Sequence, residues 1–170
     1  QNPLDNTAPR MTVAENMALA FNRGEKRTLK FNRNKENILL FENLLKNLNL
    51  GLEHKINTEM GVLSGGQRQA IALLMATMKA PELILLDEHT AALDPKTQKK
   101  IMALSEEKIK EKNLTALMIT HNLQDALTYG NRMLLLHQGE IVRDFSEEEK
   151  KKLSVTDLYK IMIELDEKDN

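Results

Sequence analysis

An acidic pair follows an apolar run in the second half of the chain. Asp87 and Glu88 come directly after the run 83–86, which has the composition of a buried strand. An aspartate at a strand end can hold Mg²⁺, usually through water, and a neighbouring carboxylate can orient an attacking water or take its proton. The pair alone also fits a solvated turn. It therefore indicates phosphate chemistry only together with other residues.

A second polar group stands at a predicted helix start. Ser64 precedes two glycines and Gln67, and a helical run follows over 68–79. A serine N-cap and two glycines with bare backbone N–H groups make an anion cradle, which the helix dipole favours. A simple glycine-rich turn would explain Gly65 and Gly66 but would leave Ser64 and Gln67 unexplained.

A third candidate is His121, which follows the apolar run 114–119. Open α/β sheets bind ligands where their strands end, and both His121 and the acidic pair occupy such places. A lone histidine at a strand end is more often structural than catalytic. Its meaning depends on the other two groups.

The first half of the chain is expected to be helical. Residues 1–9 contain turn formers and predict an extended loop. Thr12 and Glu15 have capping-box spacing, so a helix should begin there. A second helix is expected over 36–50, with Gly51 as its C-terminal stop. Its apolar positions are Ile38, Leu39, Phe41, Leu44, Leu45 and Leu48.

The second half predicts alternating strands and helices. The run 83–86 predicts a strand buried on both faces of a parallel sheet. Asp94 and Pro95 predict the N-cap and first residue of a helix reaching about Glu111. Residues 114–119 predict the next strand, and a short helix should follow.

The chain end predicts a hairpin and two helices. The strand 132–136 should turn at 138–139 into a strand that includes 141–142. Ser146 begins a capping box, and Ser154 or Thr156 should start the last helix. Helices followed by alternating strands and helices predict an α/β sheet with a helical appendage.

Composition narrows the class of protein. The chain has 170 residues, 24 Lys+Arg, 25 Asp+Glu and no Cys. The length suits one domain, the charge balance argues against a nucleic-acid binder, and zero Cys excludes a thiol-based site. No apolar run approaches the ~18 residues of a membrane span, and the N-terminus lacks a signal-peptide pattern. We expect a soluble, intracellular protein.

The order and spacing of the three polar groups match one family. Residues 63–67 read LSGGQ, residues 85–88 read LLDE, residues 90–95 read TAALDP and residues 120–121 read TH. Ser64 precedes Asp87 by 23 positions, and Asp87 precedes His121 by 34. Over essentially its whole length, the chain resembles the ATP-binding-cassette ATPases.

The resemblance implies a fold and a division of the chain. The fold class is α/β: a P-loop NTPase core with a mostly parallel sheet flanked by helices, a helical signature subdomain, and the N-terminal strands missing. Residues 4–80 would form the helical subdomain, 81–145 a partial catalytic core, and 146–170 the C-terminal helices. No Gly-x-x-x-x-Gly-Lys-Ser/Thr phosphate loop occurs in the sequence.

Roles carried over from the family concern ATP and Mg²⁺. Asp87 resembles the Walker B aspartate that positions Mg²⁺, and Glu88 the general base. The signature loop of this family contacts the γ-phosphate of ATP on the opposite subunit. The residues that match it are Ser64, Gly65, Gly66 and Gln67.

Three further positions match the family's connecting loops. Asp94 ends the D-loop, which crosses the dimer interface beside the nucleotide. His121 resembles the switch histidine that contacts the γ-phosphate. Gln1 resembles the Q-loop glutamine, which serves catalysis and the Mg²⁺ site. One departure is His89, where many transport members have proline; we interpret it as a subgroup trait rather than a metal ligand.

The function implied is that of an ATPase subunit of an ABC transporter, in particular a bacterial importer. ATP and Mg²⁺ would be its cofactors, and this chain alone would be inactive without a phosphate loop. Its partners would be a second ATPase subunit in a head-to-tail dimer, transmembrane permease subunits facing 11–50, and an extracytoplasmic substrate-binding protein, with no nucleic acid. It would lie in the cytoplasm, peripheral on the inner face of the membrane.

Two alternatives stay open. One is a soluble ABC ATPase of the translation or repair type; only 63 positions separate Gln1 from Ser64, which leaves no room for the long coiled coil of repair relatives. The other is a truncated docking module without activity. The basic stretch 23–35 is either solvated surface or a partner-binding patch.

Overall fold

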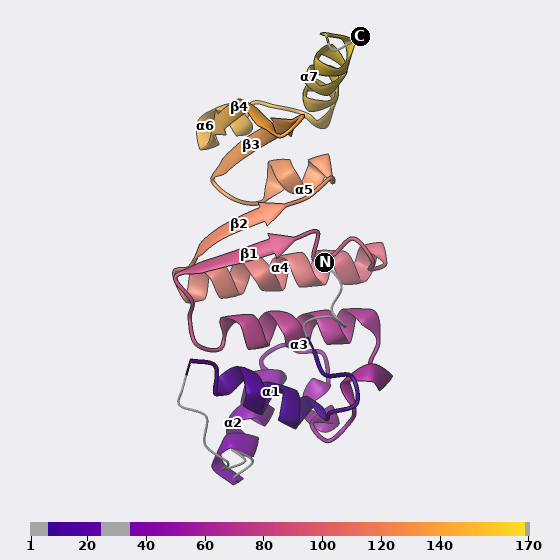
Figure 1. Ribbon diagram of the computed structural model, residues 1–170, viewed down its shortest axis with the longest axis vertical. Helices are drawn as coiled ribbons and strands as arrows, with labels where there is room; N and C mark the ends of the chain where they lie inside the picture. The colour runs from indigo at the N-terminus through magenta and orange to yellow at the C-terminus, as the bar shows by residue number, and fades with distance from the viewer. Residues whose placement is uncertain (1–6, 25–34, 169–170) are drawn as a thin grey trace. The chain divides into compact units, whose positions relative to one another are not determined.

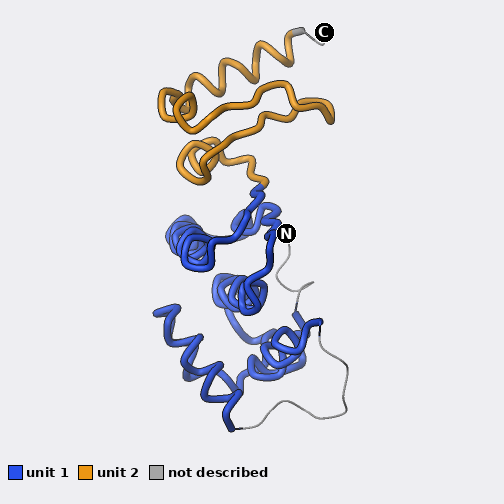
Figure 2. Tube along the Cα trace, turned by 90° about the vertical axis from the view of Figure 1, so that its left-hand side faces the viewer, with its two compact units in different colours: residues 1–118 blue, residues 119–170 orange. Residues whose placement is uncertain are grey.

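The computed structural model describes residues 7–24 and 35–168. The chain divides into two compact units, residues 1–118 and 119–170, which are coloured separately in Figure 2. Each unit is described by itself below. The predicted division at 80/81 and 145/146 stays a prediction.

Helix α1 (Val13–Phe21) begins at the capping box expected from the sequence. The backbone N–H of Glu15 donates to Thr12 Oγ1 at 3.2 Å, and the backbone N–H of Thr12 donates to Glu15 Oε2 at 2.7 Å. The buried Asn16 side chain then ties the preceding loop to the helix, because its Nδ2 donates to the carbonyls of Ala8 and Met11.

Helix α2 (Lys35–Lys46) ends four residues earlier than expected. Leu48 and Asn49 donate their backbone N–H groups to carbonyls three residues back, so the chain tightens into turns after Lys46. Gly51, with a φ of 66°, does not end α2 but precedes the 3-10 helix η1 (Leu52–Lys55). The expectation that Leu39 faces the core is also wrong, since it is 60% exposed.

The core of the first unit lies between its helices (Figure 1). Helix α3 (Gly65–Thr77) follows the short 3-10 helix η2 (Met60–Val62) and packs against α1 and against α4 (Pro95–Glu111). The Phe21 and Phe41 rings meet edge to face at 5.9 Å between centroids. The largest fully buried apolar side chains are Val13, Met17, Phe41, Leu45, Leu52, Met60, Ile71 and Ile101.

Strands β1 (Leu83–Asp87) and β2 (Thr115–Ile119) pair in a two-stranded sheet. Helix α4 (Pro95–Glu111) connects them, and the two arrows point the same way in Figure 1, as in a parallel β-α-β unit. Ile84 and Leu86 join the core with Ile101 of α4, whereas Leu83 and Leu85 are 53% and 66% exposed. The prediction of a strand buried on both faces is therefore wrong for the described residues, because the core covers one face only.

The second unit contains α5 (Leu123–Thr128), β3 (Arg132–His137), β4 (Glu140–Ser146), α6 (Glu147–Lys150) and α7 (Val155–Lys168). Strands β3 and β4 form their own antiparallel sheet, joined by Gln138 and Gly139 at φ of 50° and 83°. The predicted hairpin and capping boxes are confirmed. No helix among the described residues has the length and apolar content needed to cross a membrane.

Candidate nucleotide site

The signature segment forms the start of α3. Ser64 is the N-cap: its Oγ accepts from the backbone N–H of Gln67 at 3.3 Å, and Gln67 Oε1 accepts from the backbone N–H of Ser64 at 3.2 Å. The side chain of each of these two residues therefore accepts a hydrogen bond from the backbone of the other. The first N–H groups of a helix have no partner within it, and here they belong to Gly65 and Gly66. The capped helix start is as expected from the sequence, and anion binding there stays a prediction.

Gly66 has a packing role that its place in the motif does not reveal. A Cβ added there would lie 2.2 Å from Thr97 Cγ2 on the first turn of α4, whereas a Cβ on Gly65 would lie 3.5 Å from Leu93 Cδ2. Only a glycine at position 66 lets the two helices approach so closely. The start of α3 is thus held against the start of α4.

Two cationic residues that support the signature segment were not found from the sequence. Arg68 Nη1 donates to the carbonyl oxygens of Leu63 and Gly61, which fixes the chain entering Ser64. Lys55 Nζ donates to Gln67 Oε1 at 3.4 Å. Neither contact has a local pattern, because one partner is backbone and the other lies 12 residues away.

The acidic pair lies at the carboxyl end of β1, as predicted. Asp87 is exposed, and Glu88 is half-buried. The φ of Glu88 is +42°, the left-handed region, which costs a residue with a side chain roughly 1–2 kcal/mol. The backbone N–H of Ala91 donates to the Glu88 carbonyl at 3.0 Å and closes the turn. Such strain often persists at functional sites.

Asp94 is the N-cap of α4, also as predicted. Its Oδ1 accepts from the backbone N–H groups of Lys96 and Thr97, both at 3.1 Å. Hydrogen bonds from Thr97, first from its side chain and then from its backbone, hold the pKa of Asp94 below its usual 3.8. The carboxylate at the end of the loop 88–94 is therefore anionic at neutral pH.

His89 has a specific partner inside the protein. Its side chain is buried, and its Nε2 lies 3.0 Å from Ser105 Oγ on α4. No local sequence pattern pairs these residues, since 16 positions separate them.

In the first unit, the signature segment packs on the first turn of α4, Asp94 caps that helix, and the loop 88–94 joins the acidic pair to it. His121 belongs to the second unit, where it is exposed and adjoins Asn122, the N-cap of α5. Gln1 lies outside the described residues. The roles assigned to all these residues stay predictions.

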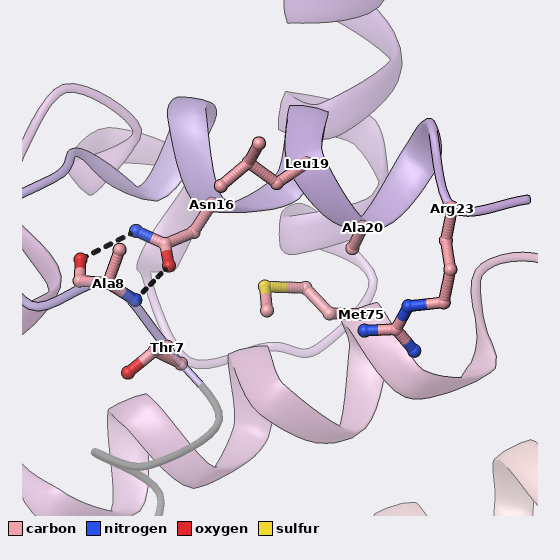
Figure 3. Close-up of a pocket in the computed structure, with 7 residues that line it drawn as sticks. All are labelled: Thr7, Ala8, Asn16, Leu19, Ala20, Arg23 and Met75. Carbon is pink, nitrogen blue, oxygen red and sulfur yellow. Dashed lines mark hydrogen bonds between the residues drawn. The ribbon is translucent and has the colours of Figure 1, made fainter. Parts of the chain in front are cut away.

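A pocket of about 320 Å³ opens between α1, α3 and the loop before α1 (Figure 3). Asn16 lies on one side and bonds to both backbone groups of Ala8, accepting from its N–H at 2.7 Å and donating to its carbonyl at 3.0 Å. Arg23 and the exposed Leu19 also line the pocket. Four of its lining residues belong to the segment 11–50 predicted to face a permease, whereas Thr7, Ala8 and Met75 lie outside that segment.

Comparisons with known proteins agree on one family. The family model described as ABC transporter matches residues 1–91. A tyrosine transport ATP-binding protein of Clostridioides difficile is 46% identical over 158 residues, 93% of this chain. An aliphatic sulfonates import ATP-binding protein of Burkholderia cenocepacia is 38% identical over 136 residues, 80% of this chain.

The chain is shorter than these relatives. It spans 62% of the length of the first and 38% of the second. Among solved structures, the dimeric post-hydrolysis state of the ATP-binding cassette MJ0796, bound to ADP and Pi, has a TM-score of 0.67 and 32% identity. That match covers 86% of this chain and 60% of the cassette. The cassette likeness confirms the predicted α/β fold class.

Proposed function

The chain belongs to the ABC transporter family, and on that premise we propose that it acts within an ATP-hydrolysing subunit of a bacterial importer. One observation carries the proposal: the capped signature helix start packs on the first turn of α4, and the loop from Glu88 to Asp94 leads into that same helix. The groups expected to handle the phosphate are therefore supported by one element.

The acidic pair fits Mg²⁺ and a base. Mg²⁺ binds through one or two carboxylates together with phosphates and water, and the exposed Asp87 offers such a carboxylate. When bound, MgATP supplies the phosphoryl group and neutralises part of its charge. Glu88, in its constrained backbone conformation, orients the attacking water and accepts its proton.

The signature segment acts on a nucleotide held by a second subunit. The backbone N–H groups of Gly65 and Gly66 donate to γ-phosphate oxygens, and the α3 dipole favours the negative charge. Asp94 belongs to the loop that crosses the subunit interface, His121 would contact the γ-phosphate, and Gln1 would link the Mg²⁺ site to the helical region. Because the 170 residues contain no phosphate loop, we propose that they do not hydrolyse ATP by themselves.

The pocket between α1 and α3 is our candidate for permease contact. It combines an exposed leucine, Leu19, with the cationic Arg23, a combination that suits an amphipathic segment. The protein would then lie on the cytoplasmic face of the membrane, and an extracytoplasmic binding protein would deliver the solute. The relatives' names cite tyrosine and aliphatic sulfonates, so we assign no solute.

The test is Glu88→Gln in the full-length gene product. We expect phosphate release to fall by about 10²–10⁴-fold, the range for loss of a general base, while ATP still drives dimer formation in size-exclusion chromatography. Glu82→Gln, an exposed carboxylate at the opposite end of β1, is the matched control and should leave turnover unchanged. Full turnover by the Glu88 variant would contradict the proposal. Turnover by these 170 residues alone would contradict the need for a phosphate loop.

A further inference from the structure

The buried pair His89 and Ser105 has no part in the phosphate chemistry proposed above. His89 directly follows Glu88, but it is buried and only 7% exposed. Its partner Ser105, on α4, is 3% exposed. Their side chains meet at 3.0 Å between Nε2 and Oγ. A buried polar pair of this kind is costly to break, because each partner would lose its hydrogen bond away from water.

The direction of this hydrogen bond follows from Ser105. Its hydroxyl donates to the Ile101 carbonyl at 2.8 Å and so has used its only proton. Ser105 Oγ must then accept from His89. The ring nitrogen Nε2 of His89 therefore carries a hydrogen and donates it to α4.

The bond acts on the strained segment that carries Glu88. The left-handed φ of Glu88 has to be held by its surroundings. The turn 88–91 closes through the Ala91 N–H, and Asp94 then caps α4. Since Ser105 lies on the same helix, α4 contacts both ends of the loop 88–94. His89 bonds to Ser105 near the beginning of the loop, and Asp94, at the end of the loop, caps α4.

Helix α4 also supports the signature segment. Thr97, on its first turn, leaves no room for a side chain on Gly66. Any displacement of the loop relative to α4 therefore changes the position of Glu88 relative to the start of α3.

We propose that His89 and Ser105 form a positioning clamp that holds the Glu88 backbone in its left-handed conformation and so sets the position of its carboxylate at the carboxyl end of β1. The clamp rests on the proposed function, in which Glu88 is the base.

The kinetic test uses His89→Ala and Ser105→Ala in the full-length gene product. Misplacing a catalytic group by about 1 Å costs up to about 100-fold, so we expect kcat to fall about 10- to 100-fold. The KM for ATP should stay within about twofold, since phosphate binding does not involve the clamp. The double variant should be no slower than the slower single variant, because each substitution already removes the contact between His89 and Ser105.

Two variants separate positioning from stability. His89→Gln keeps an N–H donor for Ser105 and should retain kcat within about threefold. Thr77→Val removes a comparably buried hydroxyl, which donates within α3 to the carbonyls of Leu73 at 3.0 Å and Leu74 at 3.2 Å. It should lower the unfolding midpoint without changing kcat per folded molecule. A Thr77 variant that loses as much kcat as His89→Ala would overturn the clamp.

Hydrogen exchange of the Ala91 amide tests the clamp without turnover. His89→Ala and Ser105→Ala should speed its exchange at least about tenfold through local opening, and Thr77→Val should not. Unchanged Ala91 protection in both clamp variants would overturn the inference. By contrast, a wild-type protein without turnover, or full turnover by Glu88→Gln, would overturn the proposed function. The exchange of the Ala91 amide would still test the clamp, because it does not depend on turnover.

Discussion

Residues 13–104 and residues 119–168 keep their elements in place by different means. In the described part of the chain, all buried apolar side chains but one belong to 13–104, and the second unit contributes only Leu158. Apolar side chains of the second unit are instead exposed on its hairpin and on α7, among them Leu136, Ile141 and Tyr159. The first unit is therefore stabilised by a core and the second mainly by local hydrogen bonds.

The local hydrogen bonds of the second unit include those of two helix caps and of one buried lysine. Ser146 and Glu149 form a capping box, and Ser154 pairs with Asp157 in the same way at α7. Lys150 Nζ donates to the carbonyls of Gly130 and Tyr129 at the end of α5. The acidic pair and the signature segment both belong to the first unit, and its buried core can hold their backbones in fixed positions.

The largest effect should come from emptying the core. Phe41→Ala removes a fully buried ring from between α1 and α2 and should lower the free energy of unfolding by about 3–5 kcal/mol. Urea unfolding measures it. Leu136→Ala, at a position 63% exposed in the second unit, should change it by less than about 0.5 kcal/mol. Equal effects would abolish the contrast between the units.

A smaller effect should follow from adding one methyl group where the start of α3 packs on the start of α4. Gly66→Ala places Cβ against Thr97 and should cost about 1–3 kcal/mol of unfolding free energy by overpacking. Gly65→Ala has ordinary contact distances and is the matched control. Thr97→Ser removes the clashing methyl but keeps the hydroxyl near Asp94, so it should restore most of the loss. A Gly66 variant as stable as wild type would show that α3 and α4 can separate freely.

Loss of one cap should affect the second unit alone. Ser146→Ala removes the acceptor for the Glu149 N–H and should cost about 1 kcal/mol, measured by hydrogen exchange of amides in α6 and β4. Amides of α3 should keep their protection. Faster exchange in α3 would mean that the units share their stability.

The smallest effect should be a local dependence on acid. Hydrogen bonds from Ser146, first from its hydroxyl and then from its backbone, lower the pKa of Glu149 below its usual 4.5. A lowered pKa means that the cap stabilises α6 fully above about pH 4.5 and loses that contribution as the pH falls through the folded-state pKa. The protection of α6 amides, measured as their exchange rate relative to the intrinsic rate at each pH, should therefore fall on acidification. Glu149→Gln keeps a cap acceptor without titrating and should flatten this dependence; an unchanged profile would argue against it.

Much of the fold could be predicted because its signals are local. The caps at Thr12, Ser64, Asp94 and Ser146 all stand where the sequence places them. Each needs only residues two or three positions apart. The predicted end of α2 is wrong because the helical spacing of apolar residues continues through Leu48, whereas the backbone tightens into turns after Lys46. The predicted burial of β1 is wrong because an apolar run does not show whether one face of the strand or both are covered by other elements.

The sequence by itself determined the family, the helix starts and the candidate residues, because motif spacing and capping are properties of neighbouring positions. Only the tertiary structure decided that His89 bonds to Ser105, that Gly66 meets Thr97 and that Arg68 holds the chain before Ser64. Two of these contacts join residues from different elements, and the third ends on a backbone carbonyl. Such pairs arise when helices pack, which no local pattern records.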